Sequence, residues 1–314
     1  MTLTLYSPEG IVENTGRSTA ATIGVFDGVH IGHRHLLKQL AAASGGLASV
    51  AVALTSHPAY VLGSRTDDRW LDEPGEHRDL LFEAGADYVA ELPFTREVAA
   101  MSACQMAEAL HRQLHMKKLL LGYDSRFGSR KADDFGRLPA LAARLGFDLM
   151  QGQPYGLDGQ PASSSRIREA LWQGNVGEAR TLLGRPYSLC GTVEHGRGVG
   201  RTLGFPTANI NLAHSRKMQP AEGVYAVRLT TSDGAASATK GMANLGAAPT
   251  FGIEQPQLEV HLMDFCADLY GRQATVEFIG RVRPTRRFTD AEALKKQISK
   301  DYITCREIFS NTSW

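Results

Sequence analysis

Two histidines, His30 and His33, stand three residues apart where an apolar run gives way to an amphipathic segment. The apolar run covers residues 20–26 and stops at a turn that contains Gly28, and the amphipathic segment covers residues 33–43. A strand that ends at a glycine turn and feeds a helix presents backbone N–H groups and the positive end of the helix dipole at one point, which suits a phosphate. The two imidazoles could donate hydrogen bonds to phosphate oxygens whose charge grows during a displacement.

Two further segments place polar side chains where an apolar run ends. His57 and Pro58 follow one run, and residues 122–128 add a carboxylate, an arginine and an aromatic residue after another. Ligands collect beyond the carboxyl ends of parallel strands, so we expect these segments to share a pocket with the two histidines. Each segment taken alone is equally consistent with an ordinary surface loop.

A fourth segment, residues 163–168, reads Ser-Ser-Ser-Arg-Ile-Arg and precedes an amphipathic stretch. A serine in this position is a routine helix N-cap. Hydroxyl and N–H groups at a helix N-terminus, with Arg168 nearby, also make an anion cradle, and the two interpretations are compatible.

The first half of the chain alternates short apolar runs with helical patterns, which predicts an α/β domain with a parallel sheet covered on both faces. Strands are expected at residues 20–26, 49–54, 88–92, 118–123 and 147–151, and helices at residues 33–43, 76–84, 102–114 and 136–145.

After residue 184 the pattern changes to alternating apolar and polar residues, which predicts a closed or nearly closed antiparallel β-barrel followed by a terminal helix. Strands are expected at residues 189–193, 207–211, 224–229, 258–263 and 274–279, a hairpin turn at 231–234 and the helix at 290–309. We place the domain boundary near Gly184, giving domains of residues 1–184 and 185–314.

The second half has its own candidate site. Residues 196–201 are rich in glycine and basic, which suits backbone wrapping of phosphate, but they lack the Gly-Lys-[Ser/Thr] ending of a P-loop. Thr207 and Asn209 follow, two residues apart, so on a strand their side chains share one face. A hydroxyl and an amide oxygen side by side suit a hard cation such as Mg²⁺ held together with substrate phosphates.

Composition narrows the class of protein. The 314 residues contain 34 Lys and Arg against 33 Asp and Glu, so no basic field favours nucleic acid or an anionic membrane. No leader and no apolar stretch long enough for a membrane span is visible, and the four cysteines are scattered without a zinc or disulfide pattern. We therefore expect a cytoplasmic protein with reduced thiols and without a nucleic-acid or membrane partner. A monomer is the default expectation, because the sequence does not determine the oligomeric state.

The histidine segment, in the order G-x-F-D-G-x-H-x-G-H, resembles the signature of the HxGH nucleotidyltransferase superfamily, in the version found in bacterial bifunctional riboflavin kinase/FAD synthetases. Residues 163–168 resemble the same family's S-S-T-x-I-R motif. Residues 204–209 resemble the G-x-P-T-A-N motif of riboflavin kinases, and further matches follow in order at residues 223–225, 244–251, 258–265, 268–271, 287–288 and 294–298. The resemblance spans the chain from about residue 20 to residue 298.

The resemblance implies a Rossmann-like HxGH nucleotidyltransferase domain followed by a β-barrel riboflavin kinase domain, which together phosphorylate riboflavin to FMN and adenylylate FMN to FAD. Glu259 becomes the base that accepts the proton of the riboflavin 5′-hydroxyl. His30, His33 and Arg168 become catalytic groups of adenylyl transfer. The remaining implied site residues are Gly24, Phe26, Asp27, Gly28, Gly122, Asp124, Ser164 and Ser165 for the ATP of adenylyl transfer; His57, Pro58, Arg126 and Phe127 for its flavin; Gly196, Gly198, Gly200, Arg201 and Pro206 for the ATP of the kinase; Asn244, Gly246 and Thr250 for its flavin; and Thr207 and Asn209 for Mg²⁺.

Three positions depart from the family pattern. Leu54 and Ser125 stand where the family usually has aromatic residues, and Ser56 where it has proline. Aromatic faces hold an isoalloxazine ring, so these departures bear on flavin binding in the first domain. The alternatives are a riboflavin kinase with weak or altered nucleotidyltransferase activity, a nucleotidyltransferase for another small phosphate, and a flavin-binding module without turnover.

Overall fold

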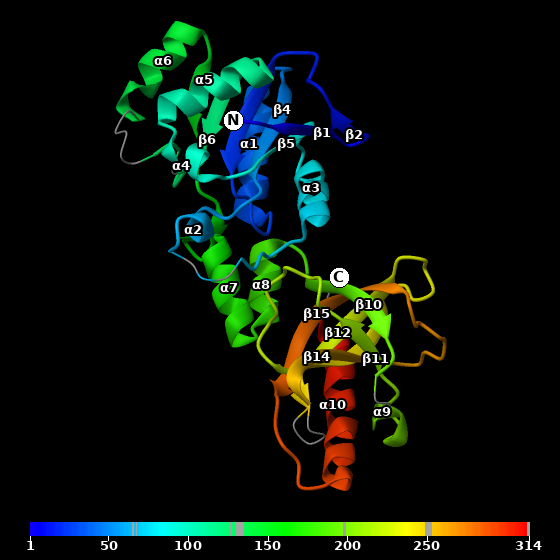
Figure 1. Ribbon diagram of the computed structural model, residues 1–314. Coiled ribbons are helices and arrows are strands. Elements are labelled where there is room, and N and C mark those ends of the chain that lie inside the picture. Colours follow the sequence, from blue (N-terminus) through cyan, green and yellow to red (C-terminus); the bar gives the residue numbers. More distant parts are fainter. Residues whose placement is uncertain are drawn as a thin grey trace. The chain divides into compact units, whose positions relative to one another are not determined.

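A computed structural model describes residues 1–64, 66, 68–125, 127–129, 135–196, 199–248 and 253–312. The chain forms two compact units, Met1–Ser164 and Ser165–Trp314, each with its own sheet (Figure 1). The boundary expected near Gly184 stays a prediction.

The first unit is built on a seven-stranded sheet with the strand order β2-β1-β5-β4-β3-β6-β7. Its parallel part comprises β3 (Thr19–Gly24), β4 (Ala48–Leu54), β5 (Tyr88–Leu92), β6 (Met116–Leu121) and β7 (Asp148–Gln151). These are the five strands expected from the apolar runs. An antiparallel hairpin of β1 (Thr4–Ser7) and β2 (Gly10–Val12), which the sequence analysis did not predict, extends the sheet beside β5.

Helices cover both faces of this sheet (Figure 1). On β4, Val50 and Val52 face the core under the α5 and α6 helices, whereas Ala51 and Ala53 face the core under α1 and α3. Burial on both faces explains why the strands read as continuous apolar runs rather than as alternating ones. The helices of this unit are α1 (Ile31–Ser44), α2 (Pro58–Val61), α3 (Pro74–Glu83), α4 (Arg96–Ala100), α5 (Ala103–Leu114), the 3₁₀ turn η1 (Phe135–Arg137) and α6 (Leu138–Leu145), and a small hairpin joins β8 (Gly156–Leu157) to β9 (Gln160–Pro161).

The second unit contains a closed antiparallel barrel with the strand order β10-β11-β14-β13-β12-β15. Its strands are β10 (Tyr187–Glu194), β11 (Ala208–Asn211), β12 (Gly223–Thr231), β13 (Thr239–Ala248), β14 (Ile253–Leu262) and β15 (Gln273–Pro284). Five of them and the hairpin between β12 and β13 were expected. The β13 strand was not expected, because after Thr239 it contains no β-branched residue and consists mainly of Gly, Ala, Asn and Met.

The helices described in this half of the chain are α7 (Ser164–Gln173), α8 (Val176–Leu183), α9 (Val199–Thr202) and the terminal α10 (Ala291–Asn311). The α10 helix packs Cys305 and Phe309 against apolar residues of β12, β13 and β15. An ion pair between the partly buried Arg283 and the buried Asp301, with 2.8 Å between Nη2 and Oδ2, connects it to β15. Arg281 donates to the carbonyls of Gln173 and Glu222, which fastens the end of α7 to the barrel.

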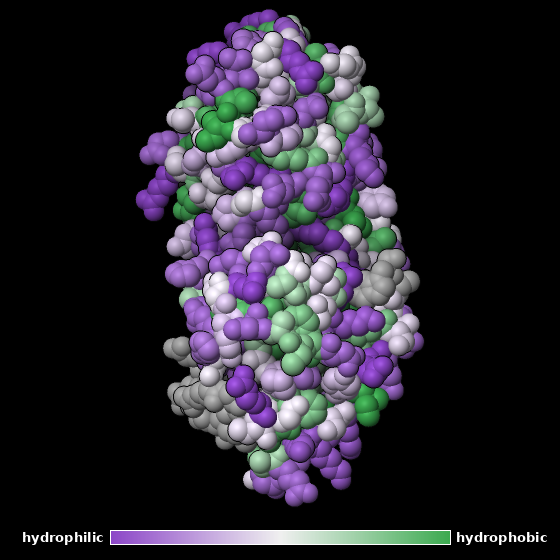
Figure 2. Space-filling model, turned by 90° about the vertical axis from the view of Figure 1, so that its right-hand side faces the viewer, coloured by the Kyte–Doolittle hydropathy of each residue, from purple (hydrophilic) through white to green (hydrophobic). Residues whose placement is uncertain are grey.

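Within the described residues, no helix combines the length and the hydrophobicity that a membrane span requires. On the face drawn in Figure 2, hydrophilic residues cover most of the surface and hydrophobic ones are interspersed among them, which is ordinary for a protein surface.

Candidate active sites

The histidine turn connects the end of β3 to the start of α1. His30 is the N-cap of α1, and its Nδ1 accepts a hydrogen bond from the backbone N–H of His33 at 3.3 Å. The two rings stack with their centroids 3.6 Å apart, and Phe26 meets the His33 ring edge-on at 5.3 Å. The structure therefore brings the two predicted histidines together at a helix N-terminus, next to the carboxyl end of a central parallel strand.

The turn has an unusual backbone. Phe26, Gly28 and Val29 all have positive φ angles, of 52°, 85° and 34°. Left-handed backbone costs about 1–2 kcal/mol for a residue other than glycine, and it is rarest for a β-branched one such as Val29. Both non-glycine side chains are buried in the core under α1, which offsets this strain. Such strain persists only where the surroundings fix the backbone, and it is concentrated at functional sites.

Two buried carboxylates fix this turn to the segment before α3. The Leu71 backbone N–H donates to Asp27 Oδ1 at 2.8 Å, and the Gly28 N–H donates to Asp72 Oδ1 at 2.6 Å. The other Asp72 oxygen lies 3.4 Å from His77 Nδ1. Asp27 was expected here, but Asp72 and His77 were missed. The only local signal was a carboxylate two residues before a helix-starting proline.

The histidine turn also accounts for the missing side chain at Gly32. A Cβ atom there would lie 3.1 Å from His30 Cε1 and 3.4 Å from the Ala162 carbonyl oxygen, which is tighter than nearly all real contacts. Glycine is thus the residue that lets the His30 ring fold over the first turn of α1.

The surroundings of His33 favour its neutral imidazole. Burial holds the pKa of His33 well below its usual value, and the nearby rings of His30 and His77 lower it further. Its Nδ1 is buried and has no hydrogen-bond partner among the described residues. An anion bound here would favour the protonated ring, because an opposite charge nearby raises the pKa of a histidine.

The start of α7 joins this site. Ser164, the first residue of α7, donates its hydroxyl to the Asp27 carbonyl at 2.8 Å. Ser165 is exposed next to it, and Arg168 is half-buried one turn further along, with its Nη1 4.0 Å from Met218 Sδ. Ser164, one of the residues expected to bind ATP, is therefore in contact with the histidine turn. Ser165 and Arg168 follow it in α7.

The other residues expected around this site lie at the ends of β4 and β6. His57 caps α2, whose first residue is Pro58, by accepting from the Ala59 N–H at 3.2 Å. Asp124 lies in a turn closed by the Ser125 N–H donating to the Gly122 carbonyl at 3.1 Å.

Phe127 is only 7% exposed and packs in the core under α5 and α6, so little of its ring is open to a ligand. The partly buried Leu54 packs against the same core. Gly24, at the end of β3, lies against the Phe26 ring. Arg126 lies outside the described residues.

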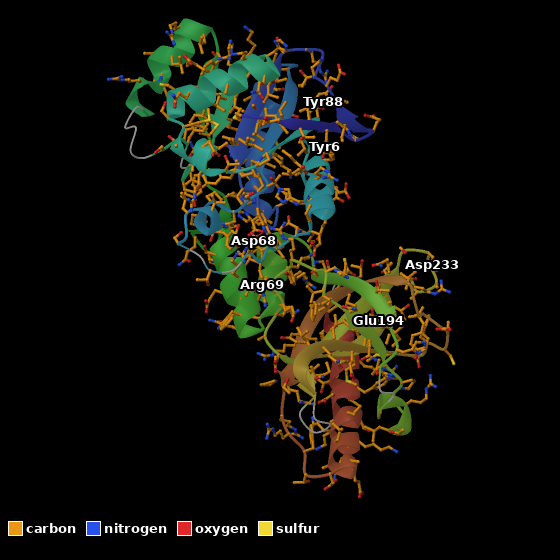
Figure 3. The ribbon with its side chains drawn as sticks, in the orientation of Figure 1. Tyr6, Asp68, Arg69, Tyr88, Glu194 and Asp233 are labelled. Atoms are coloured by element: carbon orange, nitrogen blue, oxygen red, sulfur yellow. The ribbon has the colours of Figure 1, made fainter. Side chains whose placement is uncertain are left out.

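A row of polar residues crosses four neighbouring barrel strands. Asn209 on β11 pairs with Glu194 on β10 and with Glu259 on β14, and Glu259 in turn pairs with Asn244 on β13. Figure 3 marks Glu194 at the end of β10. Residues directly opposite each other in a sheet point to the same face. Their chain neighbours, such as Val193 and Val260, are buried, so the row lies on the outer face of the barrel wall.

The glycine-rich segment lies directly against this part of the barrel wall. A Cβ atom at Gly196 would overlap the Asn209 amide, and one at Gly200 would overlap the Phe205 carbonyl and come within 3.3 Å of Thr207 Oγ1. Only glycine therefore allows the backbone to approach the two residues expected to hold Mg²⁺.

Further residues expected at the barrel site flank this segment. Arg201 is exposed near the end of the short α9 helix. The Pro206 carbonyl lies 2.8 Å from His261 Nδ1, within hydrogen-bond distance. His261 was not predicted. Gly246 has a φ of 138° and lies against the Glu222 side chain. Gly198 and Thr250 lie outside the described residues.

Glu259 is half-buried, and this burial raises the pKa of its carboxyl group. A base works best when its pKa lies near the pH at which it operates, so a raised pKa suits Glu259 to proton abstraction. Within the described part of the chain, no three His, Cys, Asp or Glu side chains are grouped to hold a metal ion. A hydroxyl and an amide remain as the candidate metal ligands.

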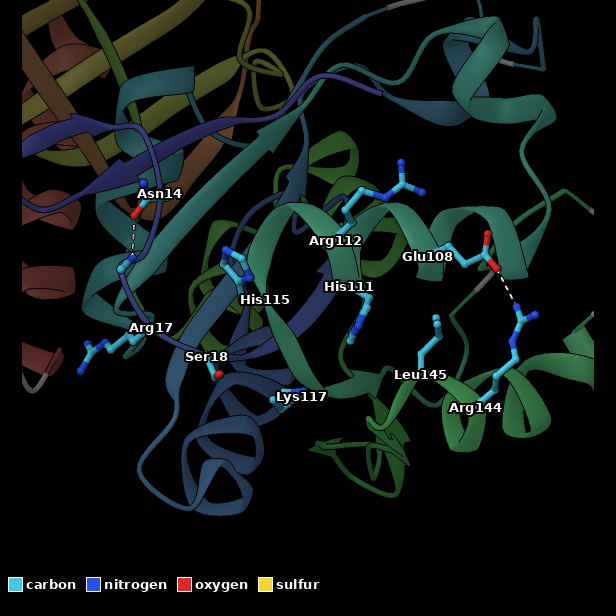
Figure 4. A pocket seen from close by; sticks show the side chains of 11 residues that line it. Asn14, Arg17, Ser18, Glu108, His111, Arg112, His115, Lys117, Arg144 and Leu145 are labelled. Carbon is cyan, nitrogen blue, oxygen red and sulfur yellow. Dashed lines mark hydrogen bonds and ion pairs between the residues drawn. The ribbon is translucent and has the colours of Figure 1, made fainter.

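The first unit also carries a basic depression near the starts of β3 and β6, at the ends of these strands that lie away from the histidine turn (Figure 4). Arg17, Arg112 and Lys117 line it, together with an ion pair between Arg144 and Glu108. Arg112 and Arg144 stand in the last turns of α5 and α6, where positive charge stabilises the helix dipole. The depression is therefore distinct from the histidine turn and has a structural explanation of its own.

Comparison with known proteins assigns both halves. A family model described as FAD synthetase matches residues 12–166, and one described as riboflavin kinase matches residues 183–309. Three relatives bear the name bifunctional riboflavin kinase/FMN adenylyltransferase. The protein of Escherichia coli (strain K12) is 37% identical over 93% of both chains, that of Haemophilus influenzae 38% identical over 93% of this chain and 94% of its own, and that of Bacillus subtilis (strain 168) 31% identical over 99% and 98%.

The chain belongs to the bifunctional riboflavin kinase/FMN adenylyltransferase family. A crystal structure of a Streptococcus pneumoniae protein, described as a macrolide-efflux protein, has the same fold with a TM-score of 0.82 and 29% identity, over 96% of this chain and 98% of its own. The FAD synthetase match contains the histidine turn and Ser164, and the riboflavin kinase match contains the polar row of the barrel. The family suggested by the sequence motifs is thereby confirmed.

Proposed function

We propose that the chain makes FAD from riboflavin in two ATP-dependent steps with FMN as the intermediate. The relatives' names join the same two activities, and the two family matches cover the two halves of the chain. Each half has its own phosphate-directed groups, so the two steps take place at separate sites. The structural observation that carries the proposal is the cross-strand row that puts Glu259 between Asn209 and Asn244, in a chain that also stacks two histidines at a helix N-terminus.

In the first step, the riboflavin 5′-hydroxyl oxygen attacks the γ-phosphorus of ATP, a new P–O bond forms and ADP leaves. Glu259 accepts the hydroxyl proton, a role for which its raised pKa is suited. The glycine segment at residues 196 and 200 lets backbone N–H groups approach the ATP phosphates. Asn244 lies across from Glu259 on β13, where it can bind and orient the flavin.

The residues present also fit a magnesium ion that accompanies ATP. Thr207 and Asn209 supply a hydroxyl and an amide oxygen, which are hard donors, and the glycine segment lies directly against both. Mg²⁺ bound there would neutralise part of the negative charge of the transferring phosphate.

In the second step, a phosphate oxygen of FMN attacks the α-phosphorus of a second ATP, and pyrophosphate leaves. His30 and His33 stand at the positive end of the α1 dipole, where donors stabilise the charge that grows on the phosphate oxygens. Ser164, which donates to the Asp27 carbonyl, adds a hydroxyl to this anion-binding surface. Ser165 and Arg168 follow in the same helix and are the further phosphate-binding candidates of the family motif. The chain's own contribution is mainly positioning and electrostatic stabilisation, because phosphoryl and adenylyl transfer need little covalent participation by the protein.

The experiment that tests the proposal is product analysis. The purified chain is incubated with riboflavin, ATP and Mg²⁺, and the flavins are separated by chromatography at successive times. We expect FMN first and FAD afterwards. Flavin that binds without ATP consumption would refute the proposal in favour of a binding module. FMN without FAD would leave a riboflavin kinase whose first unit has lost adenylyl transfer, as the non-aromatic Leu54 and Ser125 would allow.

A further inference from the structure

The segment between α2 and α3 exchanges two hydrogen bonds with the histidine turn. Asp27 of the turn accepts from the Leu71 N–H at 2.8 Å, and Asp72 of the segment accepts from the Gly28 N–H at 2.6 Å. Asp27 is 1% and Asp72 2% exposed, so both bonds are shielded from water. Hydrogen bonds from backbone N–H groups to ionised carboxylates are among the stronger ones in proteins.

The bond to Gly28 acts at the strained part of the turn. Gly28 lies between Phe26 and Val29, which have positive φ angles, and it stands two residues before the N-cap His30. The orientation of the His30 ring depends on where this short backbone stretch places its Cα atom. Asp72 also lies 3.4 Å from His77 Nδ1, and His77 is one of the two rings that lower the pKa of His33.

We propose that Asp72 is a positioning residue for adenylyl transfer, which acts through the Gly28 N–H to fix the left-handed turn that orients His30 and His33. The inference rests on the proposed function of the first unit. Asp72 lies 42 positions from His30 in the chain and outside the sequence motifs that carry the family resemblance. It contributes to the rate by holding the histidines where the α-phosphate is attacked.

The test compares two substitutions of similar shape in the full-length chain. In Asp72→Asn the amide oxygen can still accept the Gly28 N–H, whereas Asp72→Leu fills the same space without an acceptor. We expect Asp72→Leu to lower kcat for FAD formation from FMN about 10- to 100-fold, with a smaller effect on KM for ATP. Asp72→Asn should restore most of kcat, and the exposed Asp79→Ala on α3 should match the wild type.

Riboflavin phosphorylation, measured on the same samples, separates a positional effect from general misfolding and should stay unchanged in all three variants. An Asp72→Leu chain with wild-type kcat for FAD formation would overturn the inference, and so would an Asp72→Asn chain as slow as Asp72→Leu. A wild-type chain that makes no FAD would instead refute the proposed function. If Asp72→Leu does not fold, hydrogen exchange decides: a Gly28 amide that exchanges in the wild type as fast as a free loop amide overturns the inference.

Discussion

Replacing Glu259 by Gln tests the kinase site most sharply, because it removes the proton acceptor and leaves the shape of the side chain. General bases contribute about 10²–10⁴-fold to a rate. The residues paired with Glu259 across the strands are Asn209 and Asn244, whose amides cannot take up a proton at neutral pH. The imidazole two positions along β14, His261, has its Nδ1 bound at the Pro206 carbonyl. No paired neighbour can replace the base, so we expect a loss of about 10³–10⁴-fold in kcat, or about 4–5.5 kcal/mol of transition-state stabilisation.

The assay follows FMN formation from riboflavin and, separately, FAD formation from added FMN. Glu277→Gln on β15 is the matched control, because Glu277 pairs with Arg228 instead of facing the proposed site. Glu259→Gln should stop the first reaction and leave the second intact. Glu259 is not the base if Glu259→Gln phosphorylates riboflavin within 10-fold of the wild-type rate, and the two sites are not separate if the variant loses both reactions together.

Three further outcomes follow from the same structure. His33→Ala should lower the rate of FAD formation from FMN by about 10²–10³-fold and leave FMN formation unchanged, measured as initial rates; equal loss of both reactions would contradict separate sites. Since burial raises the pKa of Glu259, its base is already protonated at a pH where an ordinary Glu is ionised, so riboflavin kinase activity should fall on the acid side with an apparent pKa above about 4.5. An acid limb at or below that pKa would contradict the assignment. Asp301→Asn removes the buried carboxylate that pairs with the partly buried Arg283 and should destabilise the barrel by about 1–3 kcal/mol, seen as a lower melting temperature; an unchanged Tm would refute this.

The sequence predicted the parallel sheet well because burial on both faces leaves a simple pattern. Val50 and Val52 face one core and Ala51 and Ala53 the other, so β4 appears as one unbroken apolar run. The β13 strand was missed because its many small residues give it the composition of a loop. Small residues fit there because the neighbouring β14 strand packs closely against β13, as at Gly241.

Contacts between segments that are distant in the chain could not be predicted from the sequence. Asp72 meets Gly28 across 44 positions, and nothing in its local pattern distinguishes it from an exposed carboxylate before a helix. Similarly, an aromatic residue at position 127 looks suited to a flavin, but only the packing of α5 and α6 decides that this ring lies in the core. The roles of the site residues themselves stay predictions.

The most direct measurement of the central claim uses ATP labelled at one phosphate at a time. The chain is incubated with riboflavin, Mg²⁺ and either γ-labelled or α-labelled ATP, and the label in purified FMN and FAD is counted. We expect the γ-label to enter FMN and to be retained in FAD, and the α-label to enter FAD alone. FMN without γ-label, or FAD that lacks the α-label, would contradict it.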